Sequence, residues 1–189
     1  MLRRAVSLLA ALAFPLALGA QAPSRTVRST PYTQTISINP LGLPFGFFSG
    51  EYEFSPTGTG GLTLGVGGTY ATGYFEEEDE DESRDAWVEG KVLYYPGEVP
   101  LRGFAVGLTL GYHNARNDGG DLFTPGGVVR SEGAPTVGVL LDYNWLIGAR
   151  RRFLVGTGIG ARRVLKDVDA GSPLDQVYPD GRLQIGLAF

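Results

Sequence analysis

A single histidine, His113, is the residue of this sequence best suited to acid–base chemistry, because imidazole titrates near neutral pH. A hydrolytic histidine needs a nucleophile to activate and an acid that orients it. The position two residues on, where one type of lipid deacylase carries its serine, is Ala115, and no orienting acid stands at a matching spacing. We therefore expect a structural role for His113 and predict no catalytic residue.

Seven consecutive carboxylates run from Glu76 to Glu82. Hard divalent cations prefer oxygen ligands, but this run lacks the spaced ligands and the turn glycine of a calcium loop. A solvated loop whose charges repel one another is the simpler interpretation. Because the chain has no cysteine, thiolate metal sites, thiol nucleophiles and disulfides are excluded, and we predict no metal site.

Alternate glycines at Gly156, Gly158 and Gly160 give a superficial likeness to a phosphate-binding loop. No helix follows them, and glycine at every second position indicates one face of a strand, so we predict no cofactor. The basic run 150–152 suits lipid head groups better than nucleic acid, since the chain is acidic overall, with a formal net charge of −4.

The N-terminal stretch MLRRAVSLLAALAFPLALGAQA has the order of a secretory signal peptide: a basic start, an apolar run and small residues. The apolar run is shorter than the roughly 20 residues that a membrane-spanning helix needs. Cleavage after Ala20 is favoured over cleavage after Ala22, which would place Pro23 beside the scissile bond. The predicted segments are a signal peptide at 1–20, a short N-terminal segment at 21–31 and one domain at 32–189.

Alternation with a period of two residues dominates the rest of the chain, and 29 glycines and 12 prolines disfavour helix. Between Leu62 and Tyr74 the even positions are mostly apolar and the odd positions small. The same pattern recurs from Phe104 to Tyr112. Together with weaker segments it predicts eight strands, near residues 33–39, 46–54, 62–74, 86–95, 104–112, 136–145, 153–162 and 183–189.

The connections between these strands alternate between short turns and, with the exception of PLGLPF, long polar loops. Such alternation is typical of an up-and-down barrel whose two ends face different compartments. Aromatic residues gather near both ends of the strands, as amphipathic rings do at two membrane–water interfaces. The fold predicted is therefore all-β, an eight-stranded antiparallel up-and-down transmembrane β-barrel.

The second face of each strand decides which side of the barrel faces inward. It carries mostly Gly, Ala, Thr and Ser, which suit a narrow lumen, instead of the Lys and Glu that coat a sheet facing water. The few charges on this face carry both signs, so we expect a paired polar network that plugs the lumen. Its predicted members are Glu51, Glu53, Glu89, Lys91, Asp142, Arg162 and Arg182.

The signal peptide, the alternating strands and the closing segment RLQIGLAF resemble those of the small outer-membrane β-barrel proteins of Gram-negative bacteria. The stretch TISINPLGLPFGFFSGEYEF resembles the opening of one uncharacterised family among them. The resemblance implies residence in the outer membrane after signal-peptide removal, with residues 21–31 in the periplasm. It also implies an assembly signal, read by the barrel assembly machinery, at Leu183, Ile185, Leu187 and Phe189.

The function expected from this resemblance is a non-enzymatic outer-membrane protein with acidic extracellular loops, acting in envelope structure or surface interaction. The expected partners are membrane lipids, lipopolysaccharide and the assembly machinery; nucleic acid is not one of them, and an external partner is not specified. The strongest alternative is a narrow conduit or a binding site for a small hydrophobic molecule. A secreted soluble lipocalin-like binder, with its apolar face inside, and a lipid-modifying membrane enzyme are further alternatives.

Overall fold

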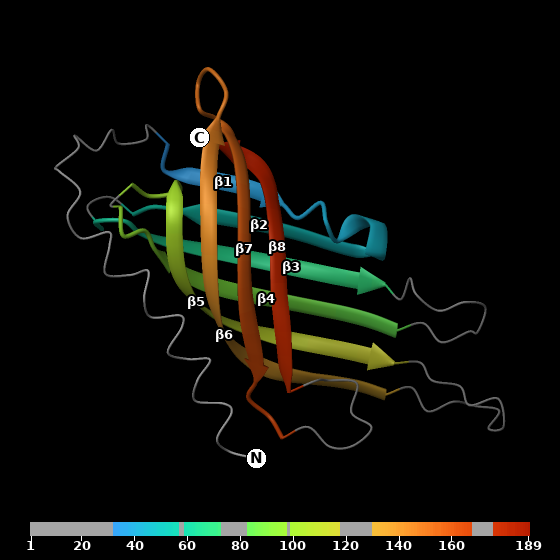
Figure 1. Cartoon of the computed structure of the whole chain (residues 1–189). Coiled ribbons are helices and arrows are strands. Elements are labelled where there is room, and N and C mark those ends of the chain that lie inside the picture. Colours follow the sequence, from blue (N-terminus) through green and yellow to red (C-terminus); the bar gives the residue numbers. More distant parts are fainter. Residues whose placement is uncertain (1–31, 57–58, 73–82, 98, 118–129, 168–175) are drawn as a thin grey trace, which may run out of the picture.

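The computed structural model describes residues 32–56, 59–72, 83–97, 99–117, 130–167 and 176–189. Eight antiparallel strands pair in sequence order and the last returns to the first, which closes the sheet into a barrel (Figure 1). The eight-stranded antiparallel barrel predicted from the alternation is thus confirmed. The signal peptide and the acidic run 76–82 lie outside the described residues.

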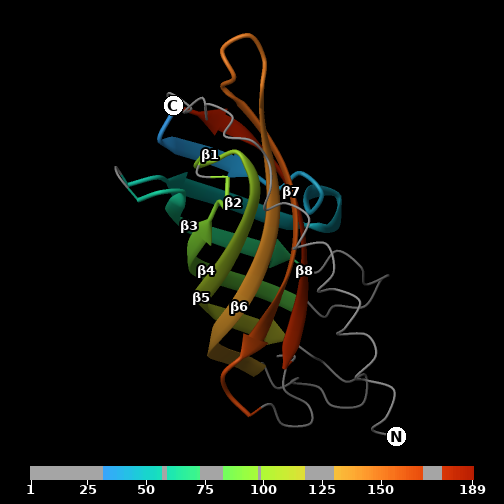
Figure 2. The same ribbon diagram turned by 60° about the vertical axis from the view of Figure 1, so that its left-hand side comes forward.

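The elements are bounded as follows: β1 Gln34–Ile38, η1 Leu43–Phe45, β2 Phe47–Phe54, β3 Leu62–Thr72, β4 Ser83–Tyr94, β5 Gly103–Asn117, β6 Arg130–Ile147, β7 Phe153–Val164 and β8 Val177–Ala188. We call the end of the barrel with the β2–β3, β4–β5 and β6–β7 turns the short-turn end, and the end with η1 the long-loop end (Figure 2). Within the described residues, no helix is long and apolar enough to cross a membrane.

Several strands extend farther toward the long-loop end than the sequence pattern indicates. β5 continues to Asn117, β6 begins at Arg130 and β8 begins at Val177. These extensions are polar or contain proline, so they lack the apolar alternation by which the rest of each strand is recognised. The pairing continues through them, for example between Arg116 and Ser131.

Side chains alternate between the lumen and the outside in the sense predicted from the sequence. On β5, Thr109 is 4 % exposed, whereas its neighbours Leu108 and Leu110 are 63 % and 66 % exposed. The same parity holds around the ring, where large apolar side chains point outward. This arrangement is the reverse of a soluble ligand-binding barrel, in which the apolar face points inward.

The seam between β1 and β8 is the least regular part of the barrel wall. Only four residue pairs join the two strands, from Thr35 with Ala188 to Ile38 with Ile185. The chain then leaves the sheet, forms η1 and returns as β2 at Phe47. From Val177 to Gln184, β8 therefore pairs with β7 alone among the described strands.

Candidate functional site

The lumen contains all seven charged residues that the sequence placed there. Five of them are buried, and the other two, Glu51 and Arg162, keep 13 % side-chain exposure. They come from five strands, since β2, β4, β6, β7 and β8 each contribute. Their side chains form two groups, one around Glu51 and one around Arg162.

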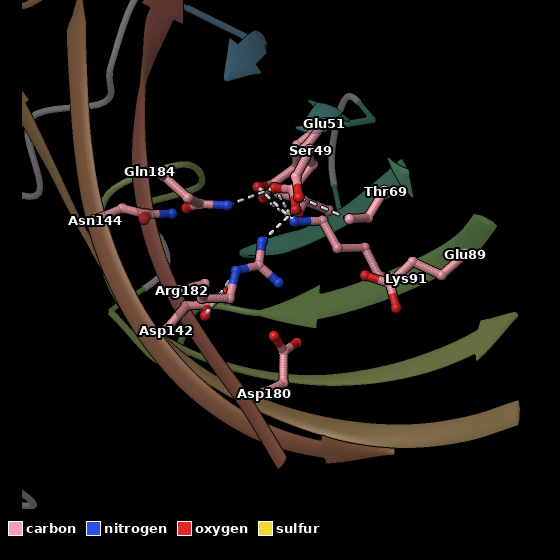
Figure 3. A network of polar contacts seen from close by, with 12 residues as sticks. Ser49, Glu51, Thr69, Glu89, Lys91, Asp142, Asn144, Asp180, Arg182 and Gln184 are labelled. Carbon is pink, nitrogen blue, oxygen red and sulfur yellow. Dashed lines mark hydrogen bonds and ion pairs between the residues drawn. The ribbon is translucent and has the colours of Figure 1, made fainter. Parts of the chain in front are cut away.

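Glu51 is the centre of the first group (Figure 3). Lys91 donates to its Oε1 from β4, and Arg182 donates to its Oε2 from β8. Gln184 Nε2 donates a further hydrogen bond of 2.7 Å to Oε1. Both carboxylate oxygens are thus engaged by partners from opposite sides of the barrel, which is the arrangement a buried charge requires.

Arg162 is the centre of the second group, nearer the long-loop end. Its Nε lies 2.9 Å from Glu89 Oε2, and its Nη2 donates to Glu89 Oε1 at 3.1 Å and to Asp180 Oδ2 at 2.8 Å. The guanidinium also lies 5.5 Å from the centre of the Trp87 ring. This one side chain of β7 thus contacts residues of both β4 and β8.

Two glycines of β7 provide the space that this network needs. A Cβ on Gly158 would lie 1.9 Å from Asp142 Oδ1, and a Cβ on Gly156 would lie 2.3 Å from Asn144 Oδ1. No side chain fits at either position without moving its neighbour. The small face recognised in the sequence is therefore the space into which the charged side chains of the other strands extend.

The short-turn half of the lumen is packed tightly. Glu53 accepts hydrogen bonds from Thr63 Oγ1 at 2.6 Å and from Tyr95 Oη at 2.9 Å, and Asn144 Nδ2 donates to Tyr95 Oη at 2.9 Å. Beside this chain of hydrogen bonds, an apolar cluster fills the space without solvent exposure; its members are Leu93, Tyr95, Ala105 and Leu140.

The long-loop half of the lumen holds a cavity of about 560 Å³. Its floor is the Glu51 group, with Arg182 and Gln184, and its lower wall includes Arg162 and Glu89. Its apolar lining comes from the β1–β2 connection, β2, β4 and β8, and includes Leu41, Phe45, Phe47, Trp87, Tyr178 and Pro179. This volume is within the range of small-molecule sites.

His113 lies in the wall of this cavity and is 3 % exposed. Its ring packs edge-on against Trp87, with 5.3 Å between ring centres, and against Tyr178 at 4.7 Å. Its Nε2 lies 3.6 Å from Asp85 Oδ1 and makes no hydrogen bond among the described residues. An acid does lie near the histidine, 28 positions before it in the chain, a separation that gives no signal before the strands are paired.

Sequence reasoning missed several members of the site. Asp180 falls within the long polar connection expected before residue 183; the ladder of β7 and β8 and its contact with Arg162 place it in the lumen. Tyr95 and Thr63 carry no charge and were not singled out. Their inward parity, shared with Lys91 and Glu53, is the signal that would have found them. No group of three or more metal-ligating side chains occurs in the described ranges.

Proteins similar to this chain are found among solved structures. No family model matches the chain, and no curated protein matches it. Among solved structures, Ail, the attachment invasion locus protein of Yersinia pestis, is similar with a TM-score of 0.49 and 13 % identity, covering 83 % of this chain and 97 % of that one. Neisserial surface protein A is similar with a TM-score of 0.42 and 14 % identity, covering 83 % and 94 %.

The class of the protein follows from its own strand pairing and side-chain parity. It is a closed, eight-stranded, antiparallel barrel with an apolar exterior and a charged, hydrogen-bonded lumen. The resemblance to small outer-membrane barrels noted in the sequence is confirmed at the level of this fold.

Proposed function

We propose that the protein is an integral outer-membrane β-barrel without enzymatic activity, whose long-loop end is exposed at the cell surface. The observation that carries this proposal is the apolar exterior. Outward-facing side chains such as Val66, Val88 and Ile159 are 59 %, 64 % and 65 % exposed. A continuous surface of this kind is unfavourable in water and suits lipid.

Aromatic residues support the same orientation in a bilayer. Near the short-turn end, Tyr143 and Trp145 pack at 4.5 Å between ring centres and are more than two-fifths exposed. Tyr70 and Tyr112, toward the long-loop end, are 45 % and 50 % exposed. Two such girdles are expected at the two interfaces of a membrane, where an amphipathic ring meets lipid and water together.

Fractionation tests the location. The mature protein is expected in the outer-membrane fraction, resistant to carbonate washing and released by detergent. Recovery in the soluble periplasm without detergent would overturn the proposal. The accompanying expectations of signal-peptide removal and assembly through the C-terminal segment are tested by N-terminal sequencing of the membrane form and by depletion of the assembly machinery.

The lumen of this barrel is proposed to be plugged, with no open path across the membrane. The packing of Leu93, Tyr95 and Leu140 without solvent exposure supports this, as does the hydrogen-bond chain from Glu53 to Asn144. Planar-bilayer recordings of the wild-type protein are expected to lack steady open-pore currents. Steady currents would support a conduit instead.

A role in envelope structure or surface interaction fits a plugged barrel, and lipids and lipopolysaccharide are its expected membrane partners. Catalysis is not expected, since Ala115 occupies the serine position of the deacylase type considered above. Hydrolysis of lipid A or phospholipid that disappears in His113→Ala would contradict this. The cavity favours a second candidate function, the binding of a small amphipathic molecule, because its lining is partly aromatic and partly charged.

A further inference from the structure

The cavity at the long-loop end is bounded by the part of the barrel wall where β8 pairs with β7 alone among the described strands. Leu41 and Phe45, in the connection from β1 to β2, line it on one side, and Pro179 and Gly181 of β8 line it on the other. Pro179 belongs to the stretch of β8 that pairs with β7 alone in the described structure. Proline, which lacks an N–H donor, is typical of strand edges of this kind.

This break in the wall opens toward the apolar exterior. Leu41 and Phe45 are 54 % and 48 % exposed, and a Cβ on Gly181 would meet nothing within 4 Å. Gly181 has the outward parity of β8, on the same face as Ile185, yet it also lines the cavity. The cavity is thus lined from both sides of the stretch where no described strand other than β7 pairs with β8.

The cavity lining carries more negative than positive side chains. Its four carboxylates face only two guanidinium groups; the carboxylates are Glu51, Asp85, Glu89 and Asp180. Arg162 and Arg182 are already engaged by three of them. Beneath the floor, Lys91 is accompanied by Glu53 and Asp142, so the deficit of positive charge is not made up from below.

Asp85 has the longest ionic contact of the four carboxylates. Its Oδ1 lies 3.6 Å from His113 Nε2, and its side chain is 39 % exposed. Around it stands a row of rings: Phe47 lies 6.3 Å from Trp87, and Trp87 contacts His113, which contacts Tyr178. Aromatic rings beside a carboxylate favour an organic cation through both the ring quadrupole and the charge, and the Arg162 guanidinium already contacts the Trp87 ring in this way.

From these observations we infer that the cavity binds an amphipathic organic cation, an ammonium group attached to an apolar body, which enters sideways from the bilayer between β8 and the η1 connection. The ammonium lies near Asp85 and the aromatic row, and the apolar body extends toward Leu41 and Phe45. This inference rests on the membrane location proposed above. A simple divalent cation is a poorer fit, because no group of metal ligands occurs in the described structure.

Tryptophan fluorescence tests the binding, because the chain has only two tryptophans and only Trp87 lines the cavity. The Trp145→Phe variant, in lipid nanodiscs, is titrated with a dodecylammonium that carries a nitroxide beside its head group. A dodecyl sulfate with the same nitroxide is the matched anionic probe. Saturable quenching by the ammonium, at least about tenfold tighter than by the sulfate, is expected for one charge recognised in a site of low polarity.

Asp85→Asn is expected to weaken ammonium binding by about tenfold, which corresponds to the loss of one charge contact. Glu132→Gln is the control, because Glu132 is an acid on β6 that pairs with Lys166 and does not line the cavity. Equal quenching by the two probes, or equal effects of the two substitutions, would overturn the inference.

A separate reporter distinguishes failure of the inference from failure of the membrane location. In Trp87→Phe the remaining Trp145 faces outward, and lipids that carry a nitroxide are expected to quench it. Absence of that quenching would defeat the location itself. Quenching of Trp145 without saturable quenching of Trp87 by the ammonium would defeat only the cation site.

Gly181→Phe tests the side entrance, because a Cβ at this position meets nothing within 4 Å and the ring is expected to narrow the break. It is expected to slow the association of the dodecylammonium about tenfold or more, whereas a water-soluble trimethylphenylammonium keeps its rate. Gly90→Phe is the control on the outer face, since Gly90 lies away from the cavity. Slowing of both ligands equally, or of neither, would overturn sideways entry.

Discussion

The two halves of the lumen are built from the same strands, but one half is filled by side chains and the other holds a cavity. In the short-turn half, apolar side chains and the side chains hydrogen-bonded to the Glu53 carboxylate fill the space, as Tyr95 and Leu140 do at 0 % exposure. In the long-loop half, long charged side chains hold one another against the wall and leave a cavity of about 560 Å³. Ion pairs between strands thus support an open space that close packing would fill.

The largest effect is expected from removing a charge that both halves share. Arg182→Met leaves Glu51 with one fewer partner and Asp142 without the guanidinium that lies 3.7 Å away. Breaking a buried pair of this kind costs about 3–5 kcal/mol. The free energy of unfolding in urea, measured in lipid vesicles, checks this.

The control for Arg182 is Lys166→Met, which removes an ion pair with Glu132 from a side chain that is 50 % exposed. Its expected cost is below about 1 kcal/mol. Similar losses for the two variants would contradict the view that the lumen network holds the strands together.

The apolar packing of the short-turn half gives the second largest effect. Leu140→Ala is expected to lower the free energy of unfolding by about 3 kcal/mol, because it opens a hole in a fully buried cluster. Leu141→Ala, at the next position, is the matched variant. The Leu141 side chain faces outward and is 43 % exposed, so a smaller loss is expected. A larger loss at Leu141 would reverse the assignment of inside and outside.

The space that Gly158 leaves for the Asp142 carboxylate gives the third largest effect on the free energy of unfolding. Gly158→Ala is expected to cost about 2 kcal/mol, because its methyl group overlaps the Asp142 carboxylate and forces it to move. Gly90→Ala, whose Cβ would approach nothing closer than 3.9 Å, is expected to have little effect. The ratio of folded to unfolded bands on unheated gels compares the two variants across a urea series.

The smallest effect on stability is expected at the C-terminus. The main chain of Phe189 exchanges hydrogen bonds with Gln34, and Phe189→Ala keeps them while removing a ring that is 46 % exposed. The amount of barrel in the membrane should fall severalfold, whereas the urea midpoint of the assembled barrel stays within error. Equal membrane levels of variant and wild type would refute the assembly role proposed for this residue.

Which side chains face the lumen and which face outward could be predicted from the sequence, because side chains alternate along a strand and the two faces differ in composition. Glu51 and Arg182 were assigned to the lumen on that basis, without knowledge of their partners. Leu140 broke the alternation in the sequence, yet it keeps its inward parity, because it packs in the buried apolar cluster with Leu93, Tyr95 and Ala105.

The cavity, in contrast, could not be predicted from the sequence. It depends on how far β8 extends beyond its pairing with β1. PLGLPF marks the end of the first strand near residue 39, but the polar start of β8 at 177–182 lacks the apolar alternation by which strands are recognised. Asp85 and His113 meet only through the register of β4 and β5, and Asp180 reaches Arg162 only through that of β7 and β8. Contacts across a sheet are set by register, which composition does not encode.

The short seam also has a mechanical consequence. Four residue pairs close the ring at β1 and β8, whereas fifteen join β5 to β6. A pulling force applied to Phe189 would therefore load a few hydrogen bonds at a time and peel β8 from β1 first. The barrel would then open between β1 and β8 while the β7–β8 ladder, with eleven residue pairs, remains paired.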